Sequence, residues 1–414
     1  MSAQSDWSGF LGSPLSRPLN MVHHTIHTKM PPATRASSTI SPMLRFLVRW
    51  SWVLIVGGLV ACSSPSRRMS EVRTESPAPS ATSSADTPRM ARSRWIPASW
   101  SDLPGWGEDN LTQAWPALLR SCERALSTWV AVCADLRQLS QASLQEQQLG
   151  LVRLLRPYRI EAATDADAGL LTAYYEPVLQ ASRLKRPGFE VPVYAPPAEL
   201  PRSPQPWYSR REIDTLVQAQ TALRGHELAY LSDPVDAMVM HIQGSARLQI
   251  QEPDGRWRQA RLAYAATNQQ PYQSIGRWLL DRRLTSDASW PGIKKWLAAN
   301  PQRRDELLWA NPRYVFFREV TVLDPAQGPT GAQGVPLTPG RSIAIDPESM
   351  PYGTPVWLVS DGAQPLRKLV VAQDTGSAIV GAVRADYFVG SGDEAGELAG
   401  RFRQSLRLWA LWPR

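Results

Sequence analysis

The chain is poor in the residues that build metal centres and disulfide frameworks. It has 414 residues but only 3 Cys and 5 His. Three of the histidines, His23, His24 and His27, lie near the N-terminus, which leaves His226 and His241 for the rest of the chain. Two histidines are too few for a His-rich zinc site, and the chain is far longer than a small disulfide-stapled domain. We therefore expect no metal or other cofactor, and one to three domains with hydrophobic cores.

The sequence also lacks a charge excess and long apolar runs. Residues 63–414 carry only half of the net charge of +8. This balance does not supply the broad cationic surface that binds nucleic acid through phosphates, so we expect no nucleic-acid partner. No series of apolar stretches reaches the roughly 20 residues of a membrane-spanning helix, which excludes a polytopic membrane protein. Trp, by contrast, is abundant at 17 residues; we expect most of these side chains to pack in cores and some to stack on sugars.

Residues 43–62 have the pattern of a secretory signal. Arg45 and Arg49 precede an apolar stretch that ends in small residues before Cys62. The sequence Leu-Val-Ala-Cys at 59–62 resembles the lipobox of bacterial lipoproteins, which implies an acylated Cys62 that anchors the protein to lipid. The alternative is an uncleaved single-span anchor, for which the apolar run at 46–61 is short. Ser63 follows the cysteine where Asp would signal inner-membrane retention, and this implies the periplasmic face of the outer membrane.

The segments on either side of this signal are not expected to belong to the fold. Residues 1–42 have no role in an export signal, and we treat them as a non-native or disordered leader. Residues 63–94 are rich in Ser, Pro and Thr and almost free of apolar side chains, so they cannot bury enough surface to offset chain entropy. We expect them to form a disordered tether.

Cys122 and Cys133 are the only cysteines after Cys62. An oxidising periplasm makes a disulfide between them plausible, and two buried free thiols are the alternative. Eleven positions correspond to about three helical turns, or roughly 16 Å of rise, which is too far for a disulfide. A bond between them therefore requires a break in the helical segment.

The body of the chain alternates helical and strand patterns and suggests β-barrels with flanking helices. Helical periodicity occurs at 144–155, 210–223, 273–284 and 292–299. Short β-like segments bounded by Pro and Gly occur at 168–179, 238–251, 256–266, 313–321, 342–345, 355–359 and 367–373. Many short strands separated by turns are typical of barrels and sandwiches.

Two of the β-like segments combine polar side chains with a backbone kink. Thr172 and Tyr174 lie just before a Glu-Pro pair, and Gln243, Gly244 and Ser245 interrupt a segment in which we expect His241 to be a strand residue. Such kinks let the backbone approach a ligand, but a β-bulge produces the same pattern for structural reasons alone. The kinks by themselves leave both interpretations open.

The C-terminal third concentrates carboxylates beside glycine. An apolar strand leads to Asp374 and a Thr-Gly turn, and Asp386 lies between Ala385 and two aromatic residues. An apolar setting raises the pKa of a carboxyl group, which would make Asp386 an acid near neutral pH. Asp346 precedes a proline and is also typical of a turn residue satisfied by its own backbone.

Six segments in this order resemble the membrane-bound lytic murein transglycosylase A family of bacterial peptidoglycan-cleaving lipoproteins, over about residues 95–412. They are TAYYEPVLQAS, MHIQGSARL, NQQPYQSIGRWL, NPRYVFF, GVPLTPGRSIAIDPESMPYGTPV and DTGSAIVGAVRADYFVGSGDEAGELAG. The resemblance implies a double-psi β-barrel domain (95–182 and 312–414), an inserted second β-barrel domain (183–311), and a substrate groove between them.

The resemblance also implies the reaction and the roles of the site residues. It implies non-hydrolytic cleavage of the bond between N-acetylmuramic acid (MurNAc) and N-acetylglucosamine (GlcNAc) in peptidoglycan strands, which leaves 1,6-anhydro-MurNAc ends. Asp386 matches the acid and base of the family, Asp374 and Asp346 match two supporting carboxylates, and Thr172, Tyr174, Gln243, Gly244 and Ser245 fall in substrate-binding motifs. The sequence departs from some members in a longer interval between Asp374 and Asp386 and in Arg384-Ala385 where they have His-Phe, which leaves the role of residue 384 open.

Two other functions compete with this interpretation. One is an outer-membrane lipoprotein that binds peptidoglycan without cutting it. The other is a hydrolase that uses Asp386 with a second carboxylate, Asp374 or Glu176, because hydrolytic glycosidases normally need two. We expect further partners among cell-wall synthesis or division proteins, although no motif in the sequence identifies one.

Overall fold

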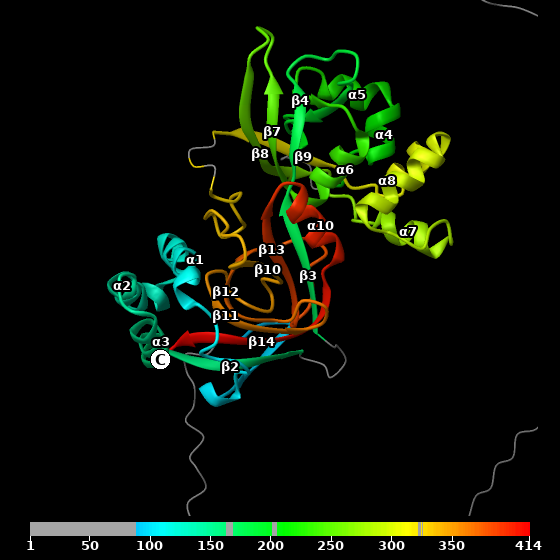
Figure 1. Ribbon diagram of the computed structural model, residues 1–414. Helices are drawn as coiled ribbons and strands as arrows, with labels where there is room; N and C mark the ends of the chain where they lie inside the picture. Colours follow the sequence, from blue (N-terminus) through cyan, green and yellow to red (C-terminus); the bar gives the residue numbers. More distant parts are fainter. Residues whose placement is uncertain (1–87, 163–168, 201–204, 322–323, 325) are drawn as a thin grey trace, which may run out of the picture. The chain divides into compact units, whose positions relative to one another are not determined.

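The computed structural model describes residues 88–162, 169–200, 205–321, 324 and 326–414, which form two β-sheets and the helices around them (Figure 1). The leader, the signal with Cys62 and most of the expected tether lie outside the described residues. The first strand begins at Ser93, at the end of that tether. No helix of the described residues is long and apolar enough to cross a membrane.

The first sheet closes into a ring of strands. Its strand order is β1 (Ser93–Pro97), β2 (Leu155–Ala162), β14 (Arg403–Pro413), β11 (Pro355–Asp361), β12 (Leu366–Asp374), β10 (Ser342–Ile345), β13 (Arg384–Ser391) and β3 (Gly169–Glu176). Strand β14 also pairs with β3, so the six strands from β14 to β3 form a closed barrel that β2 and β1 extend. Glycine is required at Gly169, because a Cβ atom there would overlap the carbonyl of Leu406 on β14. A barrel is therefore observed where the first barrel was expected, and its double-psi topology stays a prediction.

The second sheet is formed by the inserted segment and is open. Its order is β5 (Val191–Tyr194), β6 (Glu227–Leu231), β4 (Val178–Ser182), β7 (Ser245–Gln251), β8 (Trp257–Thr267) and β9 (Val315–Val320). Residues of β5 and β9 approach one another, but no ladder joins these two strands. The expected second barrel is thus a six-stranded sheet that is not closed by hydrogen bonds.

Sheet membership changes at points that differ from the expected domain boundaries. Strand β4 pairs with β7 and β6, and β9 pairs with β8, although both strands lie in ranges that we assigned to the first barrel. The chain leaves the barrel at Pro177, because proline lacks the N–H needed to continue the ladder of β3. The insert therefore begins five residues before the expected boundary and extends through β9.

Three N-terminal helices lie beside the barrel strands: α1 (Trp115–Ser121), α2 (Val130–Leu139) and α3 (Leu144–Leu154) (Figure 1). Ser143 and Glu146 form a capping box at the start of α3. The expected disulfide between Cys122 and Cys133 is present, with a Cα–Cα distance of 5.6 Å. The helical segment breaks at Ala125 and Leu126, which have extended backbones and let the chain return.

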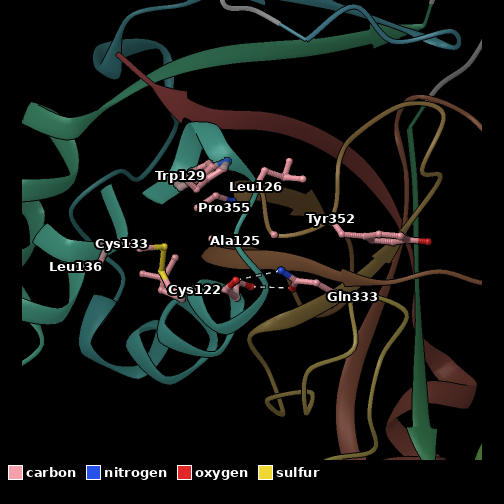
Figure 2. Close-up of a pocket in the computed structure, with 12 residues that line it drawn as sticks. Cys122, Ala125, Leu126, Trp129, Cys133, Leu136, Gln333, Tyr352 and Pro355 are labelled. Atoms are coloured by element: carbon pink, nitrogen blue, oxygen red, sulfur yellow. Dashed lines mark hydrogen bonds between the residues drawn. A yellow bond between two sulfur atoms is a disulfide. The ribbon is translucent and has the colours of Figure 1, made fainter. Parts of the chain in front are cut away.

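The disulfide lines a small apolar hollow between these helices and the barrel (Figure 2). Ser121 and Gln333 are joined there by hydrogen bonds at the edge of the hollow. Its volume of about 10 Å³ is no more than one water molecule needs. It is a packing defect and does not bind a substrate.

The remaining helices belong mostly to the insert: α4 (Arg210–Thr215), α5 (Val217–Leu223), α6 (Pro234–Gln243), α7 (Ile275–Asp281), α8 (Trp290–Ala299) and α9 (Arg304–Trp309), with α10 (Asp393–Arg401) after β13. The strand expected at 238–251 is wrong in its first half. Residues up to Gln243 are helical, so His241 is a helix residue. The N-cap Asp233 and Pro234 at N1 start α6, and buried Met238 and Met240 anchor it.

Most tryptophans of the described residues pack in cores, as expected. Trp412 contacts both Trp95 and Trp129 edge to face in the barrel core, and Trp357 on β11 is fully buried. Trp257 is an exception, with 54% of its surface exposed at the start of β8. Tryptophan therefore contributes mainly to the cores of the barrel and of the insert.

Candidate active site

Four strands of the barrel place both strand-borne aspartates in one row. Ala344 on β10 is the register partner of Asp374 on β12 and of Asp386 on β13, and Asp386 is in turn the partner of Thr172 on β3. Register partners on neighbouring strands share a face of the sheet, so these side chains lie on the same face. The two aspartates are separated by one strand, about 10 Å between their Cα atoms. Ala344, on the strand between them, is buried in a small apolar cluster with Tyr174 and Phe388.

Asp386 is partly buried and has few hydrogen-bond partners. Its Oδ1 accepts a hydrogen bond from the hydroxyl of Thr172, which itself accepts one from Arg384 Nη2 at 2.8 Å. No group of the described residues donates to Oδ2. Burial raises the pKa of Asp386, and the Thr172 hydrogen bond and the positive charge of Arg384 oppose that rise only in part. The expected direction of this pKa is thus observed.

Asp374 has partners on both of its oxygens. Tyr174 donates its hydroxyl to Oδ2 at 2.8 Å, and the backbone N–H of Ala332 donates to Oδ1 at 2.9 Å. Burial raises the pKa of Asp374, against these hydrogen bonds and that of the Thr375 backbone. Burial also raises the pKa of Tyr174, so its hydroxyl stays protonated and remains a donor. Tyr174 follows Thr172 by two residues on β3, which places both on one face.

Asp346 does not lie in this row. It follows β10 in a loop and accepts hydrogen bonds from the backbone N–H groups of Gly381 at 2.8 Å and Glu348 at 3.0 Å, and from Arg92 at 3.0 Å. Burial would raise its pKa, but these donors outweigh burial and lower it. The interpretation as a turn-stabilising residue fits this loop.

The second predicted motif lies at the end of helix α6. Gly244 ends the helix with a φ of 79°, a left-handed conformation that glycine adopts without strain, and β7 begins at Ser245. The Gln243 side chain accepts a hydrogen bond from the Tyr175 backbone N–H at 3.0 Å. The kink is therefore a helix C-terminus rather than a strand interruption, and it joins the insert to β3 of the barrel.

Residues of both sheets line one cleft of about 490 Å³. The barrel contributes Tyr174 and Asp374. The insert contributes Gln243, Gly244 and Ser245 among others, so the structure brings together five of the expected site residues. Asp386 and Thr172 continue the row beyond Asp374 and do not line the cleft itself. The charge of Asp386 nevertheless contributes to the raised pKa of Tyr272, after burial, which places this insert tyrosine near the carboxylate.

The structure excludes Glu176 as a catalytic carboxylate. Glu176 is fully buried at the end of β3 and is held by Arg247 Nε at 2.7 Å and by two nitrogens of Arg261. Both arginines also donate to the backbone carbonyl of Gln327. Glu176 therefore stabilises the crossing from the barrel to the insert. This role could not be predicted from local sequence, because both arginines are more than 70 positions away.

Arg384, whose role the sequence left open, shares a strand face with Asp386 and donates to Thr172. Three residues that line the cleft were not predicted: Tyr264 on β8, Arg318 on β9 and Arg313 just before β9. No local pattern distinguishes them from other strand residues. Among the described residues no group of three or more His, Cys, Asp or Glu side chains forms a possible metal site.

Comparisons with known proteins agree with this architecture. The MltA specific insert domain matches residues 170–318, and the 3D domain matches residues 341–412. The membrane-bound lytic murein transglycosylase A of Vibrio cholerae is 32% identical over 307 residues, which cover 71% of this chain and 76% of that protein.

Solved structures give the same result. Lytic transglycosylase LtgG of Burkholderia pseudomallei is 41% identical, with a TM-score of 0.55 over 79% of this chain and 97% of that one. Escherichia coli MltA with bound chitohexaose is 27% identical, with a TM-score of 0.56 over 77% of this chain and 91% of that one. The chain thus belongs to the membrane-bound lytic murein transglycosylase A family, whose members are peptidoglycan-cleaving lyases.

Proposed function

We propose that this enzyme cleaves the β-1,4 bond between MurNAc and GlcNAc without water and leaves 1,6-anhydro-MurNAc ends, with Asp386 as the single acid and base. One observation carries the proposal. Of the three carboxylates that the sequence analysis considered for catalysis, only Asp386 has an oxygen without a donor in the described residues. Asp374 has donors on both oxygens, and Glu176 is buried and ion-paired.

The Thr172 hydroxyl fixes which oxygen of Asp386 reacts. It accepts a hydrogen bond from Arg384 and directs its own proton to Oδ1. A proton on Asp386 is therefore favoured on Oδ2, which is free to donate it. The raised pKa keeps a fraction of the acid form present closer to neutral pH, where a general acid is needed.

The reaction balances without a second carboxylate. Asp386 gives its proton to the glycosidic oxygen as the bond from C1 of MurNAc to that oxygen breaks. The resulting carboxylate takes the proton of the C6 hydroxyl of the same sugar, and O6 closes on C1. General acid and base assistance contributes about 10²- to 10⁴-fold, and the intramolecular nucleophile contributes through proximity.

The substrate class and location follow from the cleft and the N-terminal signal. A cleft with tyrosines and amide groups suits a glycan, and the E. coli relative was solved with the glycan chitohexaose. Acylation of Cys62 would hold the enzyme at the periplasmic face of the outer membrane, next to the peptidoglycan. The proposed substrate rests on the family resemblance. The proposed location rests on the sequence before residue 88.

The test is a digest of purified peptidoglycan by the enzyme and by its Asp386→Asn variant, with fragment ends identified by mass spectrometry. We expect anhydro ends from the unmodified enzyme and none from the variant, while both bind the glycan. Reducing ends would instead indicate hydrolysis and a second carboxylate. Binding without fragments would favour the non-catalytic peptidoglycan-binding protein.

A further inference from the structure

Two arginines on the insert side of the cleft have no side-chain partner among the residues that the structure describes. Arg313 and Arg318 line the cleft, and the side chain of neither makes a hydrogen bond, an ion pair or a ring contact with the described residues. Other arginines of the same sheet are paired, for example Arg183 with Glu252 and Glu319. An unpaired guanidinium that faces a cleft is available to an anionic group of a ligand.

The register of the insert sheet places a polar group in the same row as Arg318. Ser245 on β7, Ala263 on β8 and Arg318 on β9 are successive register partners, so their side chains share one face, and all three line the cleft. Ser245 is 5% exposed and lines the cleft, and its hydroxyl makes no hydrogen bond to the described residues. The hydroxyl is therefore available to a ligand in the cleft. The small Ala263 leaves the space between Ser245 and Arg318 open.

The opposite wall of the cleft carries the negative groups. Asp374 lines the barrel side, and Asp386 continues its row. The cleft therefore has a cationic insert wall and an acidic barrel wall. A substrate that fits both walls presents a neutral glycosidic bond to the barrel and an anionic substituent to the insert.

We infer that Arg313, Arg318 and Ser245 form a subsite for a carboxylate carried by the muramic sugar. This inference rests on the proposed function and adds a determinant of substrate choice. The muramic sugar differs from GlcNAc by a lactyl ether on C3, which ends in a carboxylate when no peptide is attached and otherwise carries a stem peptide with carboxylates of its own. Chitohexaose, a polymer of GlcNAc alone, carries neither group. The subsite therefore discriminates peptidoglycan from chitin-like glycans.

The test measures binding by titration calorimetry in the Asp386→Asn background, which prevents turnover. The probes are chitohexaose, a peptide-free peptidoglycan hexasaccharide and the same hexasaccharide with stem peptides. The variants are Arg313→Met with Arg318→Met, the corresponding double Lys variant, and Arg224→Met as a matched control. Arg224 is an exposed arginine of the insert that follows α5 and does not line the cleft.

The double Met variant should lose about tenfold in affinity for a carboxylate-bearing hexasaccharide, while its affinity for chitohexaose stays within twofold. The Lys variant should keep part of the affinity, the control should keep all of it, and the preference should shrink at high salt. If the affinity for the peptide-free hexasaccharide falls, the subsite binds the lactyl carboxylate. If only the affinity for the peptide-bearing hexasaccharide falls, the subsite binds a carboxylate of the stem peptide.

Two outcomes would overturn the subsite while leaving the proposed function intact. One is an unchanged preference in a double Met variant whose melting temperature matches that of its parent. The other is an equal loss for chitohexaose, which would make the arginines general sugar contacts. Failure of the parent protein to bind any of the three glycans would overturn the proposed function itself.

Discussion

Asp346 and Asp386 are the same side chain in two different regions of one barrel, and they differ in how many donors surround them. The loop at Asp346 supplies two backbone N–H groups and Arg92, and the pKa of Asp346 is lowered. The row at Asp386 supplies one hydroxyl to one oxygen, and the pKa of Asp386 is raised. A saturated carboxylate holds a loop together, whereas an unsaturated one can exchange a proton. The count of donors, rather than the residue type, separates Asp346 from Asp386, to which we assign the proposed catalytic role.

The largest expected effect is on activity, from Asp386→Asn. The amide cannot donate and retake a proton as the carboxyl does, so turnover of peptidoglycan should fall by about 10³-fold or more. The melting temperature should change little, because Asp386 has only one partner to lose. Release of soluble fragments and thermal unfolding are the two measurements. An Asp386→Asn variant that retains a tenth of the activity would contradict the difference drawn between Asp386 and Asp346.

Asp374→Asn tests an aspartate that has more hydrogen-bond donors than Asp386 but, unlike Asp346, a raised pKa. Its two donors, Tyr174 and the Ala332 backbone, would meet an amide that can accept on only one side. The side chains in the row of Asp374 and Asp386 would shift, and displacing groups of the site in this way lowers turnover by about tenfold to a hundredfold. Tyr174→Phe is the control that removes one of these bonds and should cost less. Equal losses for Asp374→Asn and Asp386→Asn would restore the two-carboxylate hydrolase as a candidate.

Asp346→Ala should affect stability rather than chemistry. It leaves the Gly381 and Glu348 N–H groups without their acceptor, at a cost of about 2 kcal/mol in the free energy of unfolding. The carboxylate has a lowered pKa in the folded state, so it stabilises the fold above its unfolded pKa of about 3.9, and this contribution is lost as the pH falls through the folded pKa. Denaturant unfolding at pH 7 and pH 3 should therefore show a smaller difference between variant and parent at pH 3. A constant difference would contradict this role.

The smallest expected effect is a shift in pH dependence from Arg384→Met. The Arg384 charge lowers the pKa of Asp386, so its removal should raise that pKa further and extend activity to higher pH. The rate at the optimum should change by less than about tenfold, since Arg384 acts through Thr172 and through its charge. Arg384→Lys keeps the charge and is the control. The pH–rate profile is the measurement, and a shift of the alkaline limb to lower pH would show that the sign is wrong.

Much of the fold was accessible from local patterns. The bounds of β10 and of α3 agree with the sequence within one residue, because apolar runs and a capping box mark them. The apolar pattern wrongly predicted a strand in the first half of 238–251, because the apolar residues of a short buried helix resemble those of a strand. It also missed β14, whose pairing with three other strands depends on residues distant in sequence.

For the candidate site, too, local sequence indicated some features and only the structure showed the others. Residue type and neighbours in the chain indicated Asp374, Asp386 and Thr172. They could not show that Ala344 separates the two aspartates or that two arginines neutralise Glu176, because these contacts join strands more than 25 positions apart.

The sequence by itself determined the family, the barrel strands β10, β11 and β12 and the aspartates that could react, since these depend on residue identity and local spacing. Only the tertiary structure decided which carboxylate is free. Asp346, Asp374 and Glu176 each accept hydrogen bonds from donors on other strands or loops: Gly381 and Arg92 for Asp346, Tyr174 and Ala332 for Asp374, and Arg247 and Arg261 for Glu176. Burial and hydrogen bonding set a pKa, and both are properties of the assembled barrel and insert rather than of any single segment.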